Sequence, residues 1–144
     1  MEPTLDYQSA PYDFAHCFDS RCTCADKCLR HFLGEHIPAE RDYVTTVNPL
    51  KVGKSEKSCP FFRPKKIVRL AVGMIHLYDN LNYRDAVAVK REISHTLGRG
   101  IYYRIRNGER PILPDEQDYI RRVFRKHGIT TEPVFDGYKE EYEW

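Results

Sequence analysis

Apolar side chains recur at the three- and four-residue spacing of a buried helix face over much of the chain from residue 67 onward. On this spacing we predict helices over residues 26–33, 67–78, 82–97, 99–107 and 114–127. Three residues support these boundaries: Asn82 is suited to cap a helix, Gly98 to end one, and Pro114 to occupy a first helical turn. The second half of the chain is therefore predicted to be helical.

Two shorter segments favour extended structure. Residues 43–47 are β-branched and aromatic, and residues 130–135 are their candidate partner, which Pro133 restricts to a sheet edge. The acidic and aromatic residues 132–144 are expected to pack back onto the core. The pattern as a whole predicts a mainly α fold with a minor β pair.

The positions of the cysteines divide the chain into two parts. All five, at positions 17, 22, 24, 28 and 59, precede the main helical pattern. We therefore expect a cysteine-rich N-terminal subdomain over residues 1–62 and a basic helical bundle over residues 63–144 that ends in the acidic, aromatic tail. A total of 144 residues suits one ordinary domain with a small appendage.

Charge is segregated in a similar way, although the net charge of the whole chain is only +2. Residues 63–127 hold 15 Lys and Arg against 7 Asp and Glu, and the rest of the chain holds 8 against 14. A basic segment of this kind attracts polyanions such as nucleic acid. The alternative is a solvated helix face whose charge is balanced by the acidic remainder of the chain.

Features of membrane proteins and secreted proteins are missing from the sequence. No stretch approaches the roughly 20 apolar residues of a membrane helix, and residues 1–6 lack the basic and apolar regions of a secretory signal. We therefore expect a cytoplasmic protein without a membrane partner. An odd number of cysteines in such a chain argues against a disulfide framework. Reduced thiols then serve either as metal ligands or as small buried side chains.

Four of the cysteines form a predicted metal site, and these are Cys17, Cys22, Cys28 and Cys59. Four thiolates satisfy a structural zinc ion, and a chain that turns back on itself can bring them together without a large core. Cys24 is left out because residues 22 and 24 point to opposite sides of an extended segment. An iron–sulfur cluster uses the same type of ligand, and we favour zinc over it.

The segment from Lys90 to Ile120 has a distinctive order of helices and glycines. A helix ends at Leu97-Gly98, a short helix carries Tyr103-Arg104-Ile105, and residues 107–111 lead to a further amphipathic helix. In this order the segment resembles the repressor-type helix-turn-helix family, in which the short second helix enters the major groove of DNA. The interval between Gly98 and Gly108 is shorter than in that family, which implies a shortened second helix.

This resemblance implies a DNA-contacting surface. The residues that would lie on it or flank it are Arg99, Tyr102, Tyr103, Arg104, Arg106 and Arg110. Arginine can donate paired hydrogen bonds to guanine or phosphate, and tyrosine adds a phosphate donor and an apolar face. We therefore expect a DNA-binding regulatory protein with a structural metal site.

Two other classes of function compete with DNA binding. One is a protein-interaction adaptor that binds its partner through the C-terminal aromatic tail, since aromatic side chains are good interface anchors. The other is an enzyme, which we do not expect. The sequence has no phosphate-binding glycine loop, no nucleophile motif and no paired carboxylates at a suitable spacing.

Four motifs spread along the chain give a second resemblance. They are Cys17, Cys22-x5-Cys28-Leu29-Arg30, Cys59-Pro60-Phe61-Phe62 and the stretch from Tyr103 to Gly108. On these motifs the chain is similar to an uncharacterised family of small proteins from gut bacteria of the Bacteroides group. That resemblance implies no particular activity.

Overall fold

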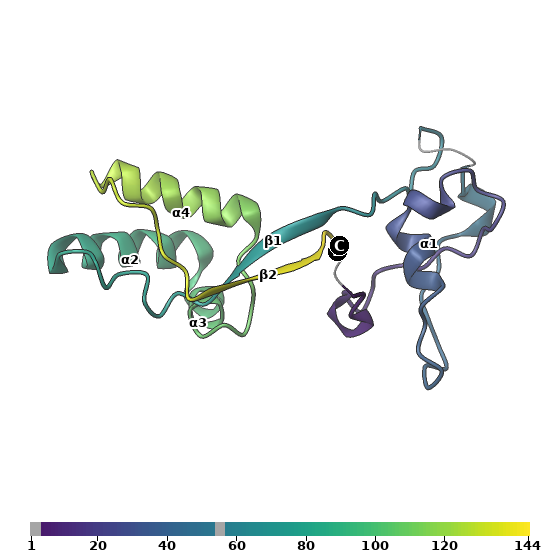
Figure 1. Cartoon of the computed structure of the whole chain (residues 1–144), viewed down its shortest axis with the longest axis horizontal. Coiled ribbons are helices and arrows are strands. Elements are labelled where there is room, and N and C mark those ends of the chain that lie inside the picture. The colour runs from purple at the N-terminus through teal and green to yellow at the C-terminus, as the bar shows by residue number, and fades with distance from the viewer. Residues whose placement is uncertain (1–3, 54–56) are drawn as a thin grey trace. The chain divides into compact units, whose positions relative to one another are not determined.

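A computed structural model of the chain describes residues 4–53 and 57–144. It contains two compact units (Figure 1). The N-terminal unit runs to Ile67 and also includes Tyr142–Trp144, and the helical unit is Val68–Glu141. Four α-helices and one antiparallel pair of strands form the regular structure of the described residues, which confirms the predicted mainly α fold with a minor β pair.

Three helices build the helical unit, and they are α2 (Tyr83–Leu97), α3 (Arg99–Arg106) and α4 (Pro114–Lys126). The side chain of Asn82 accepts a hydrogen bond from the backbone N–H of Asp85 at 2.8 Å and so caps α2 as predicted. Gly98 alone separates α2 from α3. These helices confirm the predictions for residues 82–97, 99–107 and 114–127.

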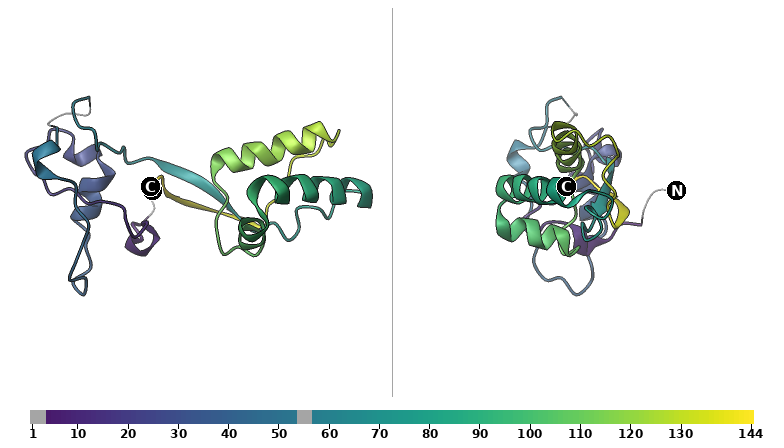
Figure 2. Two further views of the ribbon diagram at one scale, coloured as in Figure 1. Left: turned by 180° about the vertical axis from the view of Figure 1, so that it is seen from behind. Right: turned by 90° about the vertical axis from the view of Figure 1, so that its left-hand side faces the viewer.

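The core of the helical unit lies where α2 contacts both α3 and α4. It is formed by fully buried side chains from all three helices, which include Val89, Ile93, Tyr102, Ile105, Ile120 and Phe124. Both the front and back views show the three helices gathered at one end of the strand pair (Figures 1 and 2). Burial of these apolar side chains is the main favourable term in the folding of the unit.

The strand pair consists of β1 (Ile67–Val72) and β2 (Gly137–Tyr142). The helix predicted over residues 67–78 is therefore wrong, because its first half is β1 and its second half forms turns. Short apolar runs fit a strand as well as a helix, and this one is followed by Gly73 with a φ of +80°. Arg69 stays exposed on β1 and stacks on the ring of Tyr138 at 3.9 Å.

The predicted strand pair of residues 43–47 and 130–135 is also wrong. Thr46 makes only an isolated bridge with His16, and no residue of 130–135 lies in a strand. The strand that pairs with β1 is β2, which begins at Gly137 and is mostly polar. A strand with solvent on its exposed positions needs little apolar character, so the alternation that predicts strands is weak there.

The N-terminal unit has little regular structure. In the part of it that the structure describes, the longest element is α1 (Leu29–Gly34), and the other helices are the 3₁₀ turns η1 (Tyr7–Ser9), η2 (Ala25–Lys27) and η3 (Pro49–Lys51). The helix predicted over residues 26–33 corresponds to η2 followed by α1. A small core holds the unit together, made of Tyr7, Phe14, Leu29, Leu33 and Tyr142.

Polar contacts fix the loops of the N-terminal unit around this core. The buried ring of His16 lies 2.7 Å from the Tyr7 hydroxyl through Nε2 and 2.8 Å from the Thr45 carbonyl oxygen through Nδ1. At the end of the chain, the Trp144 ring packs against Phe14 with ring centroids 5.3 Å apart. The C-terminal tail thus packs back onto a core, as the sequence predicts.

One carboxylate joins the turn after β1 to the start of β2. Asp136 accepts hydrogen bonds from the backbone N–H groups of Ile75, at 2.9 Å, and His76, at 3.0 Å. Its own N–H donates to the Gly73 carbonyl at 3.1 Å. A Cβ atom at Gly73 would overlap the Asp136 carboxylate. Position 73 therefore requires glycine both for its φ of +80° and for its contact.

Gly73→Ala should destabilise the helical unit through both effects. We expect it to lower the free energy of unfolding by about 2 kcal/mol or more, measured by urea denaturation. Gly128→Ala is the matched control, because Gly128 has a φ of +75° but no atom of the described residues within 4 Å of an added Cβ. The control should cost only about 1 kcal/mol. Equal losses in the two variants would contradict the role given to Asp136.

Candidate functional site

The exposed face of α3 carries part of the residue set predicted to contact DNA. Arg99, Tyr103 and Arg104 point away from the core, and Tyr103 keeps 40% of its surface exposed. Ile105 and Tyr102 form the opposite, fully buried face of the helix. Helical geometry separates these two faces, because α3 must bury one side against α2 and leaves the other to solvent.

Tyr102 belongs to the core of the helical unit. It has no exposed surface, and its hydroxyl lies 2.9 Å from the hydroxyl of Tyr78. Burial raises the pKa of both phenols above the ordinary tyrosine value. Both hydroxyls are therefore neutral, and they satisfy each other inside the unit. Tyr102 supports the exposed face from below and has no surface of its own to offer a ligand.

Two of the predicted arginines are engaged by neighbouring side chains. Arg110 makes a paired contact with the Glu116 carboxylate, at 3.1 Å through Nη1 and 2.9 Å through Nη2. Such a two-point contact uses the guanidinium face that would otherwise bind phosphate or guanine. Arg106 is half-buried and donates to the Asn107 side-chain oxygen at 3.3 Å. These two residues frame the exposed face of α3.

A shallow groove of about 410 Å³ runs between α2 and α3. Its lining residues are Lys90, Arg91, Ser94 and His95 from α2, Gly98, and Arg99 and Tyr103 from α3, with the fully buried Tyr102 beneath them. We call this feature the basic groove. Ser94 and His95 were not predicted as site residues. The four-residue spacing from Arg91 to His95 places these two residues on one face of α2, and this spacing could have indicated His95 from the sequence.

Most cations of α4 have acidic partners among the described residues, and those at the basic groove do not. On α4, Arg121 pairs with Asp118 at 2.8 Å, and Lys126 pairs with Glu92 at 2.8 Å. The hydrogen bonds from Lys126 and His127 hold the pKa of Glu92 below its ordinary value. Arg122, also on α4, has no ion pair with another described residue and lies 6.0 Å from the centre of the Tyr119 ring. Lys90, Arg91, Arg99 and Arg104 likewise have no ion pair with any other described residue, and they gather at the basic groove and on the adjoining face of α3. Positive charge is therefore uncompensated locally at the basic groove and on the adjoining face of α3.

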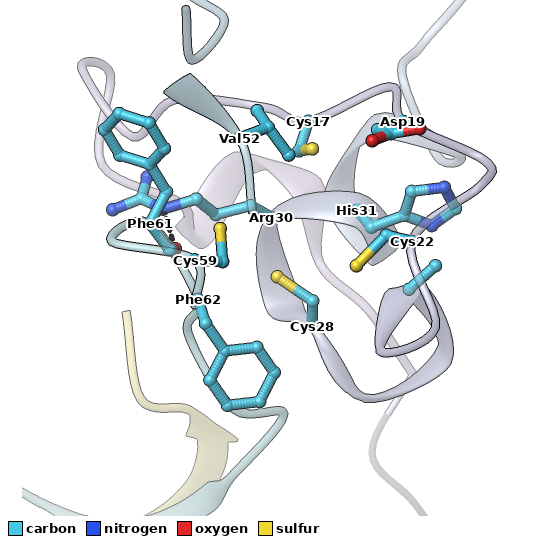
Figure 3. Close-up of a pocket in the computed structure, with 11 residues that line it drawn as sticks. Cys17, Asp19, Cys22, Cys28, Arg30, His31, Val52, Cys59, Phe61 and Phe62 are labelled. Atoms are coloured by element: carbon cyan, nitrogen blue, oxygen red, sulfur yellow. Dashed lines mark hydrogen bonds between the residues drawn. The ribbon is translucent and has the colours of Figure 1, made fainter. Parts of the chain in front are cut away.

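The four predicted metal ligands gather in the N-terminal unit. Cys17, Cys22, Cys28 and Cys59 line one small pocket of about 20 Å³ (Figure 3). Cys24 does not line it. We call this feature the cysteine pocket. As they stand, no three His, Cys, Asp or Glu side chains in residues 4–53 and 57–144 have the geometry to hold an ion.

Arg30 fixes the chain segments around the cysteine pocket. Its Nε donates to the Phe61 carbonyl at 2.9 Å, its Nη1 donates to the Ala15 carbonyl at 3.0 Å, and its guanidinium lies 4.4 Å from the centre of the Phe14 ring. One side chain on α1 thereby holds the segments that precede Cys17 and follow Cys59. Burial raises the pKa of the Cys17 thiol, and a hydrogen bond from the Asp19 backbone opposes this shift.

These features define a class of small protein in which a basic three-helix unit with a strand pair accompanies a loop-rich unit with clustered thiols. The chain belongs to a family of unknown function, DUF6078, whose family model matches residues 1–144. Membership of an uncharacterised family agrees with the sequence prediction. Comparisons with curated proteins and with solved structures give no match. None of the helices that the structure describes is long and apolar enough to cross a bilayer.

The hydroxyl pair under the basic groove can be tested by removing one partner. Tyr102→Phe leaves the Tyr78 hydroxyl without its buried partner, so we expect a loss of about 1 kcal/mol in the free energy of unfolding. Thermal and urea denaturation both measure this change. Tyr103→Phe, which removes a hydroxyl from the exposed neighbour, should leave stability unaltered within error. A similar loss in both variants would contradict the assignment of Tyr102 to the core.

Proposed function

We propose that the protein is a DNA-binding regulatory protein, without catalytic activity, that contacts the duplex through the basic groove and the exposed face of α3. The observation that supports this most is the set of four cations, Lys90, Arg91, Arg99 and Arg104, without ion-pair partners among the described residues. Lys and Arg in that state are available to phosphate oxygens, and their binding releases counterions from DNA.

The chemistry of the surface suits a duplex. Arg99 and Arg104 have guanidinium groups that can form paired hydrogen bonds with phosphate or with guanine in the major groove. Tyr103 adds a hydroxyl donor beside them, with 40% of the residue exposed. The major groove of B-DNA is about 12 Å wide and admits an α-helix, whose diameter with side chains is about 10–12 Å. The eight residues of α3 would extend about 12 Å within it.

The shortness of α3 also limits the number of DNA base pairs that the protein can recognise. Helices that read the major groove contact bases with three or four side chains, and α3 presents mainly Arg99, Tyr103 and Arg104. Phosphate contacts from α2 then supply most of the binding free energy. Affinity on this basis depends steeply on salt and only moderately on DNA sequence.

The alternative function, a protein-interaction adaptor that uses the C-terminal tail, has weaker support. Phe135 and Tyr142 each keep only 5% of their surface exposed, and the Tyr138 ring is covered on one face by Arg69. A partner would have to displace these side chains from their packing before it could use them as anchors. These aromatic side chains of the tail are therefore engaged in packing within the protein.

The first test compares two triple substitutions that remove the same charge from opposite sides of the helical unit. We expect K90Q/R91Q/R99Q to weaken binding to a labelled random-sequence duplex by about tenfold or more at low salt. The slope of log K against log salt should become shallower by about one for each phosphate that the variant no longer neutralises. Fluorescence anisotropy of the full chain over a salt series measures both quantities.

R121Q/R122Q/R125Q is the matched control, because it removes three positive charges from α4, where Arg121 and Arg125 face acidic partners. It should retain most of the affinity and the salt slope. Absence of duplex binding by the wild-type chain at low salt would refute DNA binding. Equal losses from the two triple variants would refute the assigned surface.

Tyr103→Ala separates a neutral contact from the electrostatic ones. Loss of a hydroxyl donor and an apolar face should weaken duplex binding by about 1 kcal/mol, which is roughly fivefold. The salt slope should stay the same, since no charge is removed. The same anisotropy series measures both, and Tyr138→Ala, on β2, is the control for removing a partly exposed tyrosine elsewhere. An unaltered affinity for Tyr103→Ala would place α3 outside the interface.

A further inference from the structure

The N-terminal unit has few of the usual sources of stability. Within residues 4–53 and 57–67, its longest regular element is α1 with six residues, and the buried core cluster of the described residues contains five side chains. Small units of this kind generally need disulfides, a metal ion or a partner in addition to their core. Its five cysteines all lie among the described residues and form no disulfide. A bound metal ion would stabilise such a unit, and the cysteine side chains can supply its ligands.

The four cysteines of the pocket come from different segments, each held in a defined turn. Cys17 is joined to α1 by its N–H bond to the Arg30 carbonyl at 3.1 Å. Cys22 lies in a turn closed by the Ala25 N–H, which donates to the Cys22 carbonyl at 3.2 Å, and Cys28 directly precedes α1. Cys59 lies in a turn closed by the Phe62 N–H at 3.3 Å.

Their side chains converge on the same small space. Figure 3 shows the four sulfur atoms directed into the cysteine pocket from around its wall. The pocket volume of about 20 Å³ is close to the space of a single water molecule, so it suits one ion. Four thiols around one ion-sized space match the ligand number of a closed, structural zinc site.

Positively charged and hydrogen-bonding groups next to the pocket suit a site made of four thiolates. Four thiolates around a divalent cation leave a net charge of −2, which needs nearby positive groups or hydrogen-bond donors. Arg30 lines the pocket, and its guanidinium is held in place by two carbonyl oxygens and the Phe14 ring. His31, which also lines the pocket, has its Nδ1 within 3.7 Å of the Glu35 carboxylate. His31 thus has another partner, and the four thiols are sufficient as ligands without it.

We propose that Cys17, Cys22, Cys28 and Cys59 bind one Zn²⁺ ion in a tetrahedral structural site. Binding draws the four sulfur atoms from the wall of the pocket to about 2.3 Å from the ion, and each thiol releases its proton to solvent. The ion then links α1 to the segments around Cys17 and Cys59. This site is independent of the proposed DNA interface, because every residue that forms it lies in the N-terminal unit.

The test begins with the metal content of the intact protein. Full-length chain purified under reducing conditions without a metal-affinity step should contain about one zinc per chain by elemental analysis. Titration of its thiols with an organomercurial should release that zinc, detected with a colorimetric chelator. Prolonged chelation should lower the melting temperature, and added Zn²⁺ should restore it. Replacement by Co²⁺ should give the visible absorption of a tetrahedral cobalt thiolate.

Single substitutions identify the ligands. The variants Cys17→Ser, Cys22→Ser, Cys28→Ser and Cys59→Ser should each hold well below one zinc per chain. Cys24→Ser is the matched control, since Cys24 lies in the same segment but outside the pocket, and it should keep a full equivalent. His31→Ala should also keep it. If the serine variants do not fold, the cobalt spectrum of the wild-type chain still reports four sulfur ligands.

Several outcomes would overturn the site. Wild-type chain that holds no zinc, even after incubation with Zn²⁺ and a reductant, excludes it. Iron with acid-labile sulfide, or a disulfide between pocket cysteines in reduced preparations, also excludes it. An equal loss of zinc from Cys24→Ser would contradict the assigned ligand set. None of these results depends on whether the chain binds DNA.

Discussion

Pairing of β1 with β2 is the constraint on which the helical unit depends. It joins residues 67–72 to residues 137–142 and so closes the segment that contains α2, α3 and α4. Closing so long a loop costs entropy, and burial of the side chains shared by the three helices offsets that cost. Asp136 sets where the pairing begins, because its carboxylate and its N–H both bind the turn after β1. The antiparallel order continues past the strands, where the Glu143 N–H donates to the Lys66 carbonyl at 2.8 Å.

Local signals predicted the helices well, and the strands poorly. Asn82 caps α2 and Pro114 begins α4 through interactions within a few residues, so the sequence nearby contains the necessary information. Ile67 to Val72 fits a helix stripe and a strand equally, and the choice depends on a partner about seventy residues away. β2 could not be found from hydrophobic alternation, because Lys139 and Glu140 face solvent and give the strand a polar sequence.

The candidate sites show the same division between local and distant information. The sequence predicted a basic helical region, but it did not predict which cations are neutralised, because pairs such as Lys126 with Glu92 join different helices. The burial of Tyr102 likewise depends on the packing of α3 against α2. For the cysteines, the position of Cys59 beside the N-terminal three depends on Arg30, which binds carbonyl groups on both sides of the pocket. The sequence could supply the residue types of each site, and the packing determines which of them act together.

The polar character of β2 has a further consequence for the behaviour of the chain at high concentration. The far edge of β1 is paired at Ala71, which exchanges two backbone hydrogen bonds with Ile112 at 3.2 and 2.8 Å. Among the described residues β2 pairs with β1 alone, so its other side is an open edge of the two-stranded sheet. Open edges invite intermolecular sheet growth, and charged side chains oppose it by repulsion and by the cost of desolvation. Lys139 and Glu140 therefore oppose aggregation through the open edge of β2.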